Sequence, residues 1–168
     1  IKYLEAFFQE LSLNDLDIEL VNHRKELNIS KAWMPNELDE KYKSCDEKLF
    51  NFYNKIEKKC EDKDCLLVLH EVIFHPEFIK KLSQSTYTSY FTSDDPEGSY
   101  YCSQPYAWAF DHIFHAAVYY DEISLMSNKL KEWGAKKTSL IPLGYRDSSF
   151  NKNIKENDLF NKKRTNEI

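Results

Sequence analysis

Two neighbouring carboxylates, Asp94 and Asp95, stand where a β-rich segment, residues 87–92, runs into a turn closed by Pro96. The residue before a proline prefers an extended conformation, and neighbouring side chains of an extended chain point to opposite sides. One carboxylate could therefore face a cleft and accept a proton from a hydroxyl group as a general base. The equal alternative is that the pair only shapes the turn through hydrogen bonds to the backbone. We take Asp95 and Asp94 as candidate catalytic residues.

His75 is a second candidate, because it follows a long apolar run and directly precedes Pro76. An imidazole in such a loop could bind a sugar or a phosphate, or act as a base. The alternative is a solvated histidine beside a helix start. We take His75 as a candidate substrate-binding residue.

An aromatic stretch follows the two carboxylates, and its rings could either stack on a sugar or fill the core. It contains Tyr100, Tyr101, Tyr106 and Trp108. Further along, Gly144 could let the backbone approach a ligand closely, or it could be an ordinary turn glycine. Tyr106, Gly144 and Tyr145 complete the predicted substrate-binding set.

No metal or cofactor is predicted. His112 and His115 are three apart in a predicted strand, so they face opposite sides and cannot share an ion. The chain contains none of the GxGxxG, P-loop, GxSxG or HExxH motifs. With 3 glycines in all, it offers little backbone for cradling a diphosphate.

The cysteines have neither a CxxC spacing nor a matching histidine pair. They are Cys45, Cys60, Cys65 and Cys102. Cys45 and Cys60 fall on the apolar stripe of a predicted helix. The sequence therefore favours buried free thiols in a reducing compartment.

Hydrophobic periodicity predicts the elements that position these residues. Helical spacing covers residues 1–11, 35–60, 76–82 and 121–133, the last closed by Gly134. Strand patterns cover residues 16–21, 65–69, 87–92, 112–117 and 138–141. The continuous apolar run at 65–69 is typical of a central strand covered on both faces.

Strands that alternate with helices predict an α/β fold, a three-layer Rossmann-like domain with a mostly parallel sheet. Ligands bind such sheets at the carboxyl ends of the strands, so the loops after Leu69, Thr92, Ala117 and Ile141 should frame the cleft. We assign this domain to residues 1–147 and a polar linker or tail to residues 148–168.

Bulk composition narrows the function classes. The 168 residues are 42% hydrophobic, enough for the core of one domain. The net charge is −5, whereas proteins that bind nucleic acids are usually basic, so nucleic-acid binding is not expected. No apolar run has the roughly 18 residues of a membrane span, and no signal peptide is recognisable, so we expect a cytoplasmic protein.

Four short motifs follow one another in a recognisable order. Asp94-Asp95-Pro96 ends a strand, and Asp-His-Ile-Phe begins the next at Asp111. Trp-Gly-Ala closes a helix at Trp133, and Ile-Pro-Leu-Gly follows at Ile141. This order resembles the N-terminal domain of GT-B-fold glycosyltransferases of the spore-maturation-protein (CgeB-like) type. His115 stands where that pattern often has Thr or Ser, and Asp147 falls one position late.

The resemblance spans residues 65–147. It implies the N-terminal half of a GT-B fold, with a nucleotide-sugar donor held mainly by a C-terminal domain and an acceptor sugar, lipid or protein on this side. It also implies that this chain alone is inactive and lacks a first strand. Asp94 and Asp95 would lie at the cleft between the domains, and no metal would be needed.

Two alternatives stay open. Asp94, Asp95 and Glu97 could form a metal site like the DxD motif of the other glycosyltransferase fold, although Pro96 and the spacing disagree with it. The domain could also be a non-catalytic α/β binding or interaction module.

Overall fold

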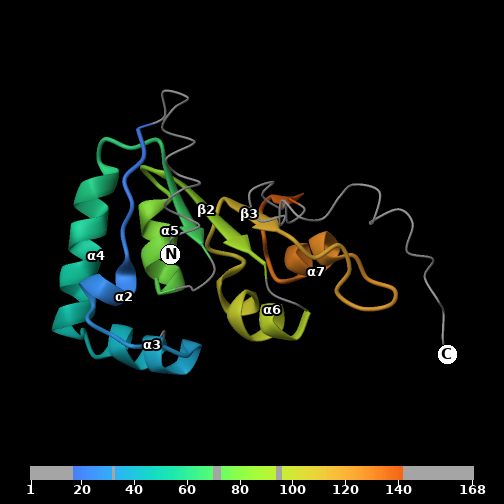
Figure 1. Cartoon of the computed structure of the whole chain (residues 1–168), viewed down its shortest axis with the longest axis horizontal. Coiled ribbons are helices and arrows are strands. Elements are labelled where there is room, and N and C mark those ends of the chain that lie inside the picture. The colour runs from blue at the N-terminus through green and yellow to red at the C-terminus, as the bar shows by residue number, and fades with distance from the viewer. Residues whose placement is uncertain (1–16, 32, 70–72, 94–95, 142–168) are drawn as a thin grey trace, which may run out of the picture.

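The computed structural model describes residues 17–31, 33–69, 73–93 and 96–141, and it shows an α/β domain built on a four-stranded parallel sheet (Figure 1). The strands are β1 (Cys65–Leu69), β2 (Tyr87–Thr92), β3 (His112–His115) and β4 (Thr138–Leu140). The helices are α2 (His23–Glu26), α3 (Pro35–Lys43), α4 (Glu47–Cys60), α5 (Pro76–Leu82), α6 (Pro96–Cys102) and α7 (Met126–Glu132), with a 3-10 turn, η1 (Gln104–Tyr106). The α/β class and the parallel sheet are confirmed, consistent with a Rossmann-like three-layer domain.

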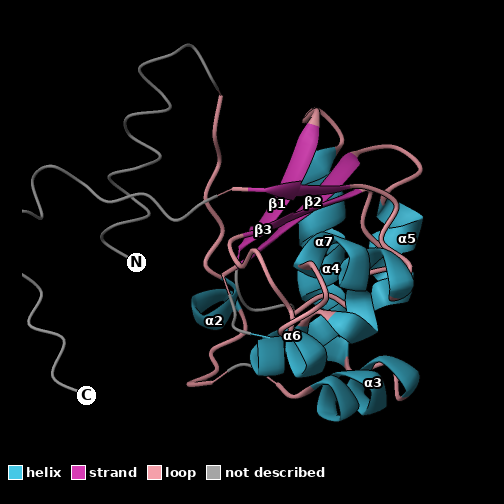
Figure 2. Ribbon diagram, turned by 90° about the vertical axis from the view of Figure 1, so that its right-hand side faces the viewer, coloured by secondary structure: helices cyan, strands magenta, loops and turns pink. Residues whose placement is uncertain are grey.

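The strands lie in the order β1-β2-β3-β4, which is also their order along the chain. Parallel neighbours joined by right-handed crossovers place their connecting helices on the same face when the order does not reverse. Figure 2 shows α4, α5 and α7 on one side of the strands. The helix-facing side of the sheet holds its fully buried residues Tyr90 and Ile113.

The core lies between the sheet and these helices, and aromatic rings fill its α4–α5 end. The ring of Tyr53 stacks on that of Phe78 with centroids 4.1 Å apart, and Phe74 lies 5.7 Å from Phe78. All three residues are buried. Each such ring contributes about 1.5–3 kcal/mol by leaving water, so this cluster fixes α5 against α4.

The predicted helix over 35–60 is two helices, because a left-handed turn interrupts it. Cys45 has φ 54°, and the N–H groups of Cys45 and Asp46 bond back to the carbonyls of Tyr42 and Lys41, which ends α3. The Asp46 carboxylate then accepts from Leu49 N–H and caps α4. The apolar spacing runs through this break and conceals it.

Three further expectations are wrong in detail. Residues 17–21 form no strand. Asp17 pairs with Lys63 and Glu19 with Lys59, so this segment lies beside the C-terminal end of α4. The strand at 65–69 is an edge strand of the described sheet. Cys60 is the only buried free cysteine among the described residues, since Cys45, Cys65 and Cys102 are exposed.

Helix α7 is shorter than predicted but ends as predicted. It begins at Met126, because Asp121 accepts from the N–H groups of Ile123 and Ser124 and forms a turn there instead. Gly134 has φ 96°, and the bonds from Gly134 N–H to Lys131 and from Ala135 N–H to Leu130 form a Schellman cap.

Candidate functional site

The candidate site is the edge of the sheet at which β1, β2 and β3 end. The strands are parallel and in register, with Leu69 beside Phe91 and Thr92 beside His115, so their carboxyl ends share one edge. Helices α5 and α6 begin at this edge, and α3 lies at the same end of the domain (Figure 1). Clefts of parallel α/β sheets form at such edges.

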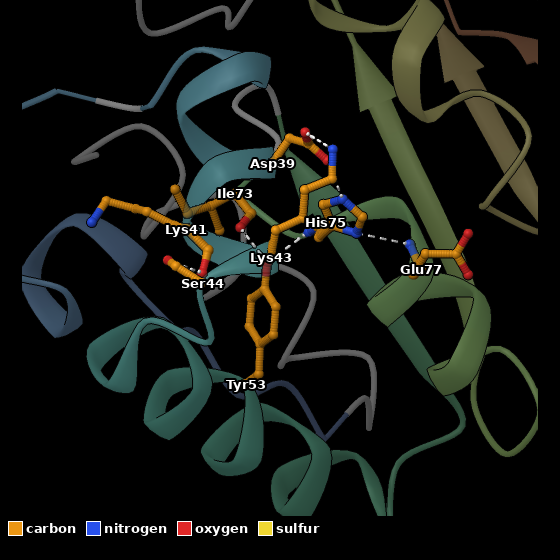
Figure 3. A network of polar contacts seen from close by, with 8 residues as sticks. All are labelled: Asp39, Lys41, Lys43, Ser44, Tyr53, Ile73, His75 and Glu77. Atoms are coloured by element: carbon orange, nitrogen blue, oxygen red, sulfur yellow. Dashed lines mark hydrogen bonds and ion pairs between the residues drawn. The ribbon is translucent and has the colours of Figure 1, made fainter.

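His75 lies at this edge as the N-cap of α5, and both of its ring nitrogens have partners (Figure 3). The Nδ1 atom accepts from the Glu77 N–H at 3.3 Å, and Nε2 lies 3.4 Å from Asp39 Oδ1. The ring also stacks on Tyr42 with centroids 3.8 Å apart and an interplanar angle of 2°. His75 therefore joins α3 to the start of α5.

These contacts define the protonation of His75. Because Nδ1 accepts from a backbone N–H, the ring proton must be on Nε2, which then donates to Asp39. Burial lowers the pKa of His75, and the hydrogen bond to Asp39 opposes that effect. His75 is thus a neutral capping residue with both ring nitrogens engaged, and a substrate that binds it would have to compete with Asp39.

Tyr53 supports the loop that carries His75. Its hydroxyl donates to the Ile73 carbonyl at 3.1 Å and accepts from the His75 N–H at 2.6 Å. Burial raises the pKa of Tyr53, so its hydroxyl stays protonated as a donor. No sequence pattern indicated this residue, because the spacing of Tyr53 within a predicted helix does not show which backbone groups its hydroxyl meets.

Tyr106 lies in η1, and only 3% of it is exposed. Its ring fills the core, one of the two possibilities that the aromatic stretch allowed, and a sugar could not stack on it in this arrangement. Tyr100 and Tyr101 of α6 are exposed instead, and Trp108 is half-buried. Of these aromatics, the two tyrosines of α6 are the accessible ones.

The remaining predicted site residues lie outside the described residues. Asp94 and Asp95 directly follow Ser93 at the end of β2, and Gly144 and Tyr145 follow β4 in sequence. Their assignments stay predictions. The described strand β2 does end at the residue before Ser93, so the chain enters the Asp-Asp-Pro segment from the carboxyl edge.

His115 is the residue that sequence reasoning missed. It is the last residue of β3, only 2% exposed, and its Nδ1 donates to the Ala117 carbonyl at 2.7 Å. With the proton on Nδ1, the Nε2 atom carries a lone pair, and this buried atom has no hydrogen-bond partner among the described residues. Buried polar atoms are rarely left unpaired, so this lone pair needs a donor that the described residues do not supply.

His112 and His115 point to opposite faces of the sheet, as their spacing predicted. His112 bonds through Nε2 to Ser139 Oγ at 2.9 Å, on the other face from His115. Within the described part of the chain, no three histidine, cysteine, aspartate or glutamate side chains gather as a metal ion would require.

Comparisons of the chain with protein-family models, curated proteins and solved structures gave no match. The likeness to GT-B glycosyltransferases therefore depends on the four motifs and their order. Among the described helices, none is both long enough and apolar enough to cross a membrane.

Proposed function

We propose that this chain is the acceptor-side domain of a nucleotide-sugar glycosyltransferase, with its acceptor bound at the carboxyl edge of the sheet. The observation that supports it most is the Nε2 atom of His115, buried at the end of β3 beside Thr92 of β2, which no described residue partners. The Asp94-Asp95 pair follows β2 directly, so carboxylates and an imidazole lone pair come from adjacent strand ends.

The chemistry requires such groups. In glycosyl transfer an acceptor hydroxyl oxygen forms a bond to the anomeric carbon of the donor, the bond from that carbon to the nucleoside diphosphate breaks, and the hydroxyl proton goes to a base. A carboxylate of Asp94 or Asp95 accepts the proton in this proposal. His115 is only 2% exposed, so in this proposal the end of β3 must open before Nε2 accepts a hydrogen bond from a hydroxyl group of the acceptor and orients it.

The donor is a nucleotide sugar bound mainly by a second domain, as the resemblance implies. The described part of this chain has no glycine-rich loop, consistent with a donor diphosphate that is bound by the other domain. No cofactor is required, and a cytoplasmic location suits a reaction that uses nucleotide sugars.

A second candidate, a non-catalytic binding or interaction domain, is favoured by one observation. Described apolar residues on one face of the sheet are solvent-exposed, among them Leu67 and Tyr87. Exposed apolar surface of this kind often marks a binding surface.

The test uses the complete protein, this chain together with its second domain, and UDP, GDP and TDP sugars as donors. Release of nucleoside diphosphate is measured in the parent protein and in the Asp94→Asn, Asp95→Asn and His115→Gln variants. Loss of the base should lower turnover about 10²–10⁴-fold in one of the two Asp variants. Asp62→Asn is the matched control, because Asp62 is exposed and lies before β1, at the opposite edge of the sheet.

Two results would contradict transferase activity. One is diphosphate release that is as fast in both Asp variants as in Asp62→Asn. The other is thermal stabilisation of the complete protein by nucleotide sugars without any release of diphosphate, which would identify a binding domain.

A further inference from the structure

The face of the sheet opposite the helices is mostly apolar and, among the described residues, carries no Asp, Glu, Lys or Arg. Residues paired across parallel strands point to the same side, so register and alternation define this face. We call it the open face, and its members are Cys65, Leu67, Leu69, Tyr87, Ser89, Phe91, His112, Phe114 and Ser139. Side-chain contacts from Cys65 to Ser89 and from Tyr87 to His112 confirm that these residues share a side.

The open face is only partly covered. Leu67 and Tyr87 are 43% and 45% exposed and Cys65 is exposed as well, whereas Ser89 and His112 at the centre of the face are buried. Helices α5 and α7 lie on the other side of the strands (Figure 2). A parallel sheet is normally covered on both faces, so this surface needs an occupant.

Two ion pairs hold the first described residues of the chain near this face. Asp17 pairs with Lys63, two residues before β1, and Glu19 pairs with Lys59 of α4. Asp17, from which residues 1–16 extend, is therefore held two residues before Cys65.

Residues 1–11 have the chemistry that the open face requires. Ile1, Leu4, Phe7, Phe8 and Leu11 form one apolar stripe at helical spacing. The opposite side of that helix would present Lys2, Gln9 and Glu10 to water. An apolar stripe suits a surface with no Asp, Glu, Lys or Arg, whereas a charged partner would find no counterpart there.

The dimensions also agree. Eleven helical residues span about 16 Å, and four strands at the usual spacing span about 14 Å. Residues 12–16 can reach up to about 17 Å when extended, enough to bring the helix from Asp17 onto the sheet.

We propose that residues 1–11 form an amphipathic helix that packs its apolar stripe on the open face of the sheet and so forms the third layer of the domain. This assignment does not depend on the proposed transferase activity. It makes the open face an internal interface rather than a docking surface for another protein.

Cross-linking to Cys65 tests this proposal in the full chain. Cys45→Ser and Cys102→Ser remove the other exposed thiols, and Cys60 stays, because it is buried and burial raises its pKa. A short bismaleimide then links Cys65 to a cysteine introduced at Leu4 or Phe8 on the stripe, or at Lys2 or Gln9 on the polar side.

We expect links within one chain from Leu4→Cys and Phe8→Cys in several-fold higher yield than from Lys2→Cys and Gln9→Cys, measured by mass spectrometry of the monomer. Equal yields from both pairs, or no link from either stripe position, would overturn the proposal. Links only between chains would do the same, because they would identify a second copy as the occupant.

A second measurement needs no introduced cysteine. Phe8→Asp places a charge in the stripe, and Gln9→Asp places the same charge on the polar side. In the Cys45→Ser, Cys102→Ser background, alkylation of Cys65 should become several-fold faster with Phe8→Asp and stay unchanged with Gln9→Asp. Equal rates in the two variants would refute the packing, and circular dichroism confirms that both variants remain folded.

Discussion

The Tyr53 hydroxyl accepts a 2.6 Å hydrogen bond from the backbone N–H of His75. Through this bond a buried side chain of α4 fixes the backbone at the start of α5, where the loop after β1 reaches the candidate site. The same hydroxyl donates to the Ile73 carbonyl, so one oxygen satisfies two backbone groups.

Tyr53→Phe should therefore destabilise the domain although it preserves the ring. It leaves the His75 N–H and the Ile73 carbonyl without their partner, which costs about 1–3 kcal/mol in the free energy of unfolding. Urea denaturation followed by circular dichroism measures the change. Tyr119→Phe is the control, because Tyr119 is exposed; equal effects of the two substitutions would show that the Tyr53 hydroxyl is not structural.

Gly134→Ala should destabilise the end of α7. The residue has φ 96°, and a Cβ at this position would lie 2.8 Å from Trp108 Cβ, so both backbone strain and a clash result. We expect a loss of more than about 1 kcal/mol. Lys131→Ala in the same helix is exposed and should change the midpoint of thermal unfolding little; a similar shift in both would argue against the close contact with Trp108.

Cys45→Gly should have the opposite sign. Cys45 ends α3 in the left-handed region with φ 54°, where glycine has no steric penalty. We expect a gain of about 0.5–1 kcal/mol in the free energy of unfolding, from the same denaturation experiment. Cys45→Ala keeps the unfavourable backbone angle and should give no gain; stabilisation by both would mean that loss of the thiol, not backbone strain, is the cause.

Stability should fall as the pH drops from 7.5 to 5. Burial lowers the pKa of His75 and of His112, so the folded state holds these rings neutral while the unfolded chain takes up protons at the ordinary histidine value. Their contribution is therefore complete above about pH 6.5 and is lost as the pH falls toward the lowered folded values. Asp39, Glu77 and Lys43 face the His75 ring, and Lys137 acts on His112.

The variant His75→Asn separates the two rings. An asparagine amide can still cap α5, so the helix start is preserved while the titrating group is removed. Denaturant midpoints measured at several pH values between 5 and 7.5 should decline less steeply in this variant. Lys131→Ala should keep the slope of the parent protein; an unchanged slope in His75→Asn would show that His75 does not couple protonation to folding.

Local sequence signals were sufficient for much of the fold. The strands at 65–69 and 87–92 and the helix at 76–82 have the predicted bounds, because apolar runs, β-forming residues and Pro76 act within a few residues. The break at Cys45 was hidden, since the apolar spacing continues through it. The edge position of β1 was also hidden, because an apolar run does not show whether its strand has one neighbour in the sheet or two.

The site was less accessible to prediction than the fold. His75 was selected for its place before Pro76, and that place makes it a helix cap with both nitrogens engaged. The sequence did not indicate His115 as a site residue. Whether its Nε2 atom has a hydrogen-bond partner depends on residues of other strands, and the sequence around His115 does not show which residues those are. Asp94, Asp95, Gly144 and Tyr145 lie outside the described residues, so their roles stay predictions.

The identity of spatial and chain order in the sheet bears on how the domain is made. Cys65 pairs with Tyr87, Ser89 with His112, and Ile113 with Thr138, so each strand finds its partner about 20–25 residues away. These separations keep the entropy of loop closure smaller than a strand order with longer crossovers would. During synthesis each newly made strand can add to the one before it, so the sheet can grow in the direction of translation.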